Sequence, residues 1–265
     1  MIYSYSRINT YKTCPKLYWY KYIEGGGKKS LPTPAMSEGL REHEKIAQGN
    51  IPEFFEPFFE KRMVNPVFEE QITADFITFE LTGILDCYSI SNNTAYIVDW
   101  KLHQIPENDD QLKIYSLLLL NKYNFLDRFN AYFVSIKGGF FKSYSYTADE
   151  VEKYLDDLVD IIQKIETDTE YKTQPSDRCA YCPFVSACYQ ENMPSLVNKI
   201  TDIETAKELA AKVYIAESFL KQVKEELKNY MFESGIDEIT FDKNRVYLST
   251  SISLRFGKVK KQKSA

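Results

Sequence analysis

The chain has 265 residues, of which 44% are hydrophobic and 27% are charged, with a formal net charge of −5. This length suits one large α/β domain with a smaller appendage, and the lack of an apolar run of about 18 residues excludes a membrane-spanning helix. The negative charge excludes a uniformly basic surface, so any contact with nucleic acid must use local groups of lysines.

The N-terminal residues 4–23 carry apolar side chains at near-helical spacing, which predicts one or two short helices. Glycines and prolines end this pattern, and a further helix is predicted over about residues 37–49. Residues 51–66 are rich in Phe, Glu and Pro without a clear period, so we expect irregular or weakly helical structure there. The first residues do not resemble a signal peptide, and we expect a reducing compartment, the cytoplasm of a bacterial, archaeal or virus-infected cell.

The central part of the chain is predicted to contain strands and helices in alternation. Two β-branched and aromatic runs within residues 67–101 are separated by Ser-Asn-Asn at 91–93, which predicts an antiparallel hairpin. A helix over residues 109–123 follows. Two strands joined at Gly138-Gly139 and an amphipathic helix over about residues 148–165 come next.

The C-terminal part differs in character from the rest. A long helix is predicted over residues 205–232, ended by Gly235. A hairpin with a turn near Lys243-Asn244 and a basic tail follow. We therefore predict two domains, residues 1–195 with the cysteine-rich region and residues 196–265.

Asp99 and Lys101 flank Trp100 on the second strand of the hairpin, so the two charged side chains point to one face of the sheet. Asp86 on the preceding strand can reach the same patch. Two carboxylates favour a hard divalent cation such as Mg²⁺ or Mn²⁺, and a neighbouring lysine can orient a water molecule or offset negative charge. A surface Asp–Lys pair beside a buried tryptophan is the alternative that this strand leaves open.

Three further polar residues have informative positions. Gln111 and Tyr115 are four residues apart on the next helix and share one face, where an amide and a phenol could meet a phosphate or a base. His43 is one of only two histidines, and imidazole suits manganese as an additional ligand, although an ordinary half-buried role is the alternative. The other histidine, His103, lies beyond the strand end without comparable context.

Three of the five cysteines, Cys179, Cys182 and Cys188, lie within ten residues. Disulfides are a poor explanation in a reducing compartment, and a tetrahedral site would need a fourth ligand. Zinc and an iron–sulfur cluster suit thiolates equally well, and spacing does not separate them. Cys87 follows Asp86 on a strand, so we expect it to face away from the metal as a small buried hydrophobe.

Six motifs occur in order along the chain: an early Cys-Pro, a helical His, Gly-x-x-Asp, Asp-x-Lys, Gln-x-x-x-Tyr and the late cysteines. Together they resemble the PD-(D/E)XK nuclease superfamily, specifically RecB-type exonucleases with an iron–sulfur cluster, including CRISPR-adaptation nucleases and AddB-like domains. The resemblance covers about residues 4–189. It implies an α/β, restriction-endonuclease-like core in which a mixed central sheet is flanked by helices and the cluster joins the N- and C-terminal segments.

The resemblance also implies roles for individual residues. The matching metal ligands are His43, Asp86, Asp99 and the main-chain carbonyl of Trp100. Lys101 matches the catalytic lysine, and Gln111 with Tyr115 match the motif that positions DNA or that lysine. Two departures from the family pattern are a leucine before Asp86 where proline is usual, and Asp99 where Glu is commoner.

The resemblance implies a fourth cysteine ligand near the N-terminus. Cys14 would join Cys179, Cys182 and Cys188 around a 4Fe-4S cluster, with zinc as the rival. The implied function is a metal-dependent DNA exonuclease that prefers single-stranded ends and has additional endonuclease activity. A catalytically idle DNA-binding or assembly module with a structural cluster or zinc is the alternative.

Lysines near both ends of the chain could bind DNA phosphates, with a steep dependence on salt. These lysines are Lys12, Lys16, Lys21, Lys258, Lys260, Lys261 and Lys263. Tyr11, Tyr18 and Tyr20 could stack on unpaired bases, although packing in the core is the alternative. The C-terminal helix and hairpin lie outside the resemblance and could cap the core, bind DNA, or mediate contact with a protein partner or a second copy.

Overall fold

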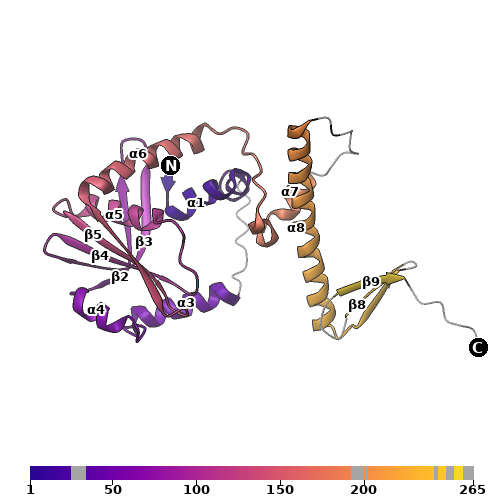
Figure 1. Ribbon diagram of the computed structural model, residues 1–265, viewed down its shortest axis with the longest axis horizontal. Coiled ribbons are helices and arrows are strands. Elements are labelled where there is room, and N and C mark those ends of the chain that lie inside the picture. The colour runs from indigo at the N-terminus through magenta and orange to yellow at the C-terminus, as the bar shows by residue number, and fades with distance from the viewer. Residues whose placement is uncertain (25–33, 192–199, 201, 242–243, 249–253, 259–265) are drawn as a thin grey trace, which may run out of the picture. The chain divides into compact units, whose positions relative to one another are not determined.

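A computed structural model describes residues 1–24, 34–191, 200, 202–241, 244–248 and 254–258 (Figure 1). The contacts within the chain divide it into two units. Unit 1 comprises Met1–Thr13 and Gly26–Tyr171, and unit 2 comprises Cys14–Gly25 and Lys172–Ala265. The predicted boundary at residue 195 lies outside the described residues and stays a prediction. None of the helices described is both long enough and apolar enough to cross a membrane.

Unit 1 is built on a mixed sheet of six strands. The strands are β1 (Ile2–Tyr3), β2 (Val67–Asp75), β3 (Glu80–Ser91), β4 (Thr94–Lys101), β5 (Arg128–Ser135) and β6 (Phe140–Thr147). Their order is β1-β3-β4-β5-β6, and β2 pairs with β3. β4 and β5 run parallel because α5 (Asp110–Lys122) provides the crossover between them. The predicted α/β fold with a mixed central sheet is confirmed.

The β3–β4 hairpin brings the acidic residues to one level of the sheet. Its turn uses Asn92 and Asn93 at φ 49° and 56°, a left-handed conformation that asparagine tolerates in tight hairpins. Cys87 pairs with Val98 in the antiparallel register. Asp86 precedes Cys87 on β3, and Asp99 follows Val98 on β4. The two carboxylates are therefore next to each other on neighbouring strands.

Helices cover both faces of the sheet (Figure 1). α1 (Tyr5–Thr13), α5 and α6 (Ala148–Thr167) lie on one face, while α3 (Pro34–Ala47) and α4 (Glu56–Arg62) lie on the other. Phe55 and Phe59 pack against Trp100 on this second face, which explains why a segment without helical period forms α4. Cys87 is fully buried in the same apolar cluster, so its expected role as a small buried hydrophobe is confirmed.

Unit 2 contains short helices, one long helix and a second sheet. The helical elements are α2 (Pro15–Tyr18), the π-helical η1 (Trp19–Ile23), the 3-10 turn η2 (Asp177–Tyr181), α7 (Val185–Glu191) and α8 (Ile203–Glu233). Gly235 follows α8 at φ 64°, which confirms the predicted end of the helix.

The C-terminal sheet of unit 2 differs from the single hairpin that was predicted. β7 (Glu238–Phe241), β8 (Asn244–Leu248) and β9 (Leu254–Lys258) form three antiparallel strands in that order. Of the two predicted turn residues, Lys243 lies outside the described residues and Asn244 is the first residue of β8.

Candidate functional site

The end of β4 carries a buried carboxylate beside a lysine. Asp99 is 1% exposed, and the Nζ atom of Lys101 lies 2.5 Å from its Oδ2 atom. The alternation of side chains along β4 sends both residues to the α5 face and sends Trp100 into the cluster on the opposite face. The predicted arrangement of Asp99, Trp100 and Lys101 on the strand is therefore present.

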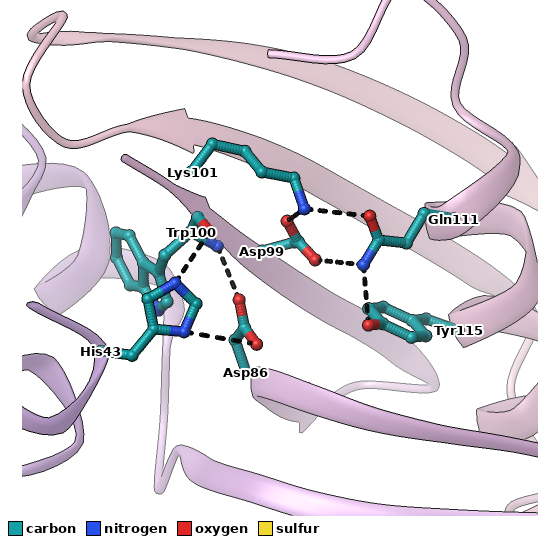
Figure 2. A network of polar contacts seen from close by, with 7 residues as sticks. All are labelled: His43, Asp86, Asp99, Trp100, Lys101, Gln111 and Tyr115. Carbon is teal, nitrogen blue, oxygen red and sulfur yellow. Dashed lines mark hydrogen bonds and ion pairs between the residues drawn. The ribbon is translucent and has the colours of Figure 1, made fainter. Parts of the chain in front are cut away.

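α5 supplies the groups that hold this pair in place (Figure 2). The amide nitrogen of Gln111 donates to Asp99 Oδ1 at 2.7 Å and to the hydroxyl of Tyr115 at 2.8 Å. The amide oxygen of Gln111 accepts from Lys101 Nζ at 2.9 Å. One glutamine thus fixes the carboxylate, the ammonium and the phenol, and it orients the lysine without carrying a charge itself.

His43 and Asp86 both contact the backbone of Trp100, between Asp99 and Lys101 (Figure 2). The Nε2 atom of His43 is 3.0 Å from the carbonyl oxygen of Trp100, and its Nδ1 atom is 3.8 Å from Asp86 Oδ1. The second oxygen of Asp86 accepts from the Trp100 amide at 2.9 Å. The structure therefore brings together His43, Asp86 and the Trp100 carbonyl, which lie far apart in the sequence.

Burial controls the protonation of both carboxyl groups. Burial, together with the charge of Asp99, raises the pKa of Asp86 to about 8. Burial also raises the pKa of Asp99, against the opposing effects of Lys101 and His43. A nearby positive charge would favour the ionised forms of both groups.

The donor atoms suit a hard divalent cation. Carboxylate and carbonyl oxygens are what Mg²⁺ and Mn²⁺ prefer, and an imidazole nitrogen adds affinity for Mn²⁺. The buried Oδ2 atom of Asp99 has the Lys101 ammonium as its partner. Within the described residues, no three His, Cys, Asp or Glu side chains are arranged closely enough to hold a metal ion; the groups bind one another instead.

Gly83 allows α5 to approach β3. A Cβ atom at this position would lie 2.9 Å from Leu118 Cδ1 and 3.0 Å from Tyr115 Cε1, closer than side chains normally pack. The glycine of the Gly-x-x-Asp motif therefore has a packing reason that the sequence did not reveal: it makes room for the tyrosine of the network.

The cysteines implied as cluster ligands all belong to unit 2. Burial raises the pKa of Cys188 to about 12, with further contributions from Cys14, Cys182 and Cys179. Burial also raises the pKa of Cys182, to which Cys179 and Cys14 contribute. Within the described residues, the cysteine side chains do not form a group of three that could hold a metal ion, although thiols are the ligand type that zinc and iron–sulfur clusters use.

α8 contributes a residue to this region that the sequence did not indicate. The amide nitrogen of Gln222 donates to the carbonyl oxygens of Cys179, Ala180 and Cys182 at 3.3, 3.1 and 3.0 Å. Tyr189 stacks on Phe219 of the same helix, with ring centres 4.6 Å apart. The cysteine loop is thus bonded to the helix that lies outside the family resemblance.

The lysines proposed for DNA binding near the N-terminus already have partners. Lys12 Nζ lies 2.8 Å from Asp110 Oδ2, and Lys16 Nζ lies 2.7 Å from Glu191 Oε2. These acidic partners reduce the positive potential there. The side chains of the tail lysines lie outside the described residues: Lys258, Lys260, Lys261 and Lys263.

The N-terminal tyrosines pack within the protein. Tyr18 is fully buried and Tyr20 is 3% exposed, and the Tyr20 ring stacks on Phe184. The hydroxyl of Tyr11 donates to Asp168 at 2.7 Å. The expectation that Tyr18 and Tyr20 stack on bases is therefore wrong, and the alternative of core packing is confirmed for them.

One family model and two solved structures are similar to this chain. The family model described as "PD-(D/E)XK nuclease superfamily" matches residues 33–189. The solved structure of the protein SSO0001 is similar with a TM-score of 0.48 and 13% identity, over 71% of this chain and 85% of that chain. A candidate exonuclease from Eubacterium rectale is similar with a TM-score of 0.48 and 12% identity, over 75% and 90%. No curated protein matches the sequence.

Proposed function

Because the chain belongs to the PD-(D/E)XK nuclease superfamily, we propose that it is a DNA exonuclease of the RecB type that requires Mg²⁺ or Mn²⁺. Its substrate is single-stranded ends, with internal cleavage as a second activity. The observation that carries the proposal is the continuous network from His43 and Asp86 through the end of β4 to Gln111. An idle module would not need a buried carboxylate and a lysine held by the same glutamine.

Each residue of the network has a task in phosphodiester hydrolysis. The cation would be held by His43, Asp86, Asp99 and the Trp100 carbonyl. When bound, it polarises a phosphoryl oxygen and lowers the pKa of the attacking water. Lys101, whose side chain is 25% exposed, can reach the phosphate or this water and offset the negative charge that develops.

Cleavage of labelled single-stranded DNA tests the proposal. With Mg²⁺ or Mn²⁺ present, we expect the unmodified protein to release short products, and the Asp99→Ala and Lys101→Ala variants to be slower by at least about a hundredfold. Lys113→Ala is the matched control, because this lysine pairs with Asp109 at 3.1 Å, away from the network. It should cleave normally.

Two outcomes would contradict the proposal. The first is that the unmodified protein binds DNA without cleaving it, which would favour the idle module. The second is that Asp99→Ala and Lys101→Ala cleave as fast as the unmodified protein, which would place the active site elsewhere.

We further propose that Cys14, Cys179, Cys182 and Cys188 hold a 4Fe-4S cluster, with zinc as the rival occupant. The support is the resemblance of the cysteine pattern to the cluster-binding nucleases, the contribution of Cys14 and Cys179 to the raised pKa of both Cys182 and Cys188, and the hydrogen bonds of Gln222 that brace the loop between Cys179 and Cys182. The site has no part in the hydrolysis proposed for unit 1.

A further inference from the structure

An open pocket of about 680 Å³ lies beside the end of β4. It is formed by the loop that follows this strand and by the β5–β6 hairpin. Its lining includes the ionisable side chains of His103, Glu107, Lys137 and Lys142 and the aromatic side chain of Phe140.

The sheet register places this pocket on the same face as the carboxylate network. Lys101 pairs with Ser135, which pairs with Phe140. In the neighbouring row, Asp99 pairs with Phe133, and Phe133 pairs with Lys142. Because paired residues on adjacent strands point to one face, Phe140 and Lys142 project from the face that carries Asp99 and Lys101, about 10 Å away across two strand spacings.

The loop after β4 is fixed to the hairpin by hydrogen bonds. The Ile136 amide donates to the carbonyl of Lys101 at 2.8 Å, and the Lys137 amide donates to that of Leu102 at 2.9 Å. The hydroxyl of Ser135 donates to the carbonyl of His103. The pocket wall is thus continuous with the strand that carries the catalytic lysine.

The pocket offers both features by which proteins bind an unpaired nucleotide. Phe140 is 51% exposed and presents an aromatic surface. Within the part of the chain that the structure describes, the Lys142 ammonium has no ion-pair partner and lies 4.9 Å from the Tyr144 ring centre. Lys137 is 3.3 Å from Glu38, and Glu107 is the acidic residue of the lining. Lys142 is therefore the lining lysine whose charge is most available to a phosphate.

We propose that this pocket binds the nucleotide next to the scissile phosphate of a single-stranded DNA end. Lys142 contacts its phosphate, with His103 and Lys137 beside it, and its base stacks on Phe140. The inference rests on the proposed nuclease function. It would account for the proposed preference for unpaired ends, because a base within a duplex cannot reach the ring.

Salt dependence tests the phosphate contact. In an Asp99→Asn background, which removes cleavage, the affinity for a fluorescent oligothymidine is measured by anisotropy at several salt concentrations. We expect Lys142→Gln to lower the salt slope of log K by about 0.7, the effect of one lost phosphate contact on a single strand. Lys61→Gln, on α4 at the opposite face of the sheet, should leave the slope unchanged.

A second pair of variants tests stacking. Phe140→Ala should weaken binding of the oligothymidine roughly five- to a hundredfold without changing the salt slope, and it should leave binding of a blunt duplex unchanged. Phe141→Ala is the matched control, because the Phe141 ring turns to the other face and contacts Phe55. Thermal melting of each variant verifies its fold.

The inference is overturned if Lys142→Gln leaves both slope and affinity unchanged, or if Phe140→Ala weakens duplex and single strand equally. These binding results are independent of the cleavage assay. Failure of the unmodified protein to cleave DNA would instead contradict the proposed function.

Discussion

The carboxyl groups of Asp86 and Asp99 both lie where their charged forms are disfavoured. Burial raises the pKa of each, and the charge of Asp99 raises that of Asp86 further. Between pH 3.8 and about 8, the folded protein without a cation therefore keeps a proton on Asp86 that the unfolded chain would release. The protonation of Asp86 is consequently linked to the stability of unit 1.

In the metal-free protein, we expect the free energy of unfolding to fall as pH rises from about 4 to about 8. The contribution of Asp86 is fully present below its ordinary pKa of 3.8 and is lost as pH rises through its folded pKa of about 8. Denaturant unfolding in a chelator over this pH range measures the effect. Mn²⁺ at pH 8 should restore stability, since it binds only the folded site.

Two variants control this measurement. Asp86→Asn should reduce the pH dependence because the titrating group is gone. Asp156→Asn removes an exposed acid on α6 and should leave the dependence intact. A flat profile for the unmodified protein would contradict the burial argument.

At the scale of elements, the close contact between β3 and α5 connects packing to the site. Gly83→Ala places a methyl group against Leu118 and Tyr115, and such overpacking costs about 1–3 kcal/mol. Because Tyr115 also accepts the Gln111 amide, we expect cleavage to slow beyond what the loss of stability explains. Denaturant midpoints and cleavage rates of the same preparations separate the two effects.

Gly39→Ala on α3 is the matched control for this substitution. Nothing lies within 4 Å of a Cβ atom there, so the alanine should stabilise the helix by up to about 1 kcal/mol. If Gly83→Ala behaved in the same way, the packing argument would be wrong.

The bond between α8 and the cysteine loop gives another element-scale prediction, conditional on the proposed cluster. Gln222→Leu removes the donor to three carbonyls, and loss of such outer support lowers metal affinity about 10- to 100-fold. Iron, zinc and sulfide per chain should fall accordingly. Asn229→Leu changes an exposed amide of the same helix, and equal losses in both variants would argue against a specific role of Gln222.

Elements were predictable where their signals are local. The turn at Asn92 and Asn93 specifies the β3–β4 hairpin through a conformation of its own residues. The sequence of α4 has no helical period, so this helix was not predictable from it. Phe55 and Phe59 pack against Trp100, a contact between distant parts of the chain. β9 pairs with β8 as a third strand. The residue pattern of this region did not distinguish three strands from a single hairpin.

For the whole molecule, the parts of the site that could be predicted depend on local spacing. The parts that could not be predicted depend on contacts between distant segments. Asp99, Lys101 and Gln111 lie on consecutive elements, so spacing alone indicated that they could meet. The place of His43 beside the Trp100 carbonyl depends on how α3 packs, and only the family resemblance indicated it. Lys142 reaches the same face through two strand registers, which the sequence does not specify.

The N-terminal segment Cys14–Gly25 belongs with the C-terminal part of the chain, and this gives a prediction for the whole molecule. Anaerobically purified protein should show visible absorption with iron and sulfide, and Cys14→Ser should lose them. Cys87→Ala should keep them, because Cys87 is buried in unit 1. A colourless protein with zinc and no sulfide would replace the cluster by zinc, and a full cluster in Cys14→Ser would require another fourth ligand.

Unit 2 combines an early segment of the chain with a late one, and this sets an order of events during synthesis. Cys14 leaves the ribosome early, whereas Glu191, the partner of Lys16, and Phe184, on which Tyr20 stacks, are made much later. At about 5–20 residues per second, the early segment waits roughly ten seconds or more for these partners. The sheet of unit 1 can form in that interval, so any cofactor at the cysteines would enter last, after β4 is already in place.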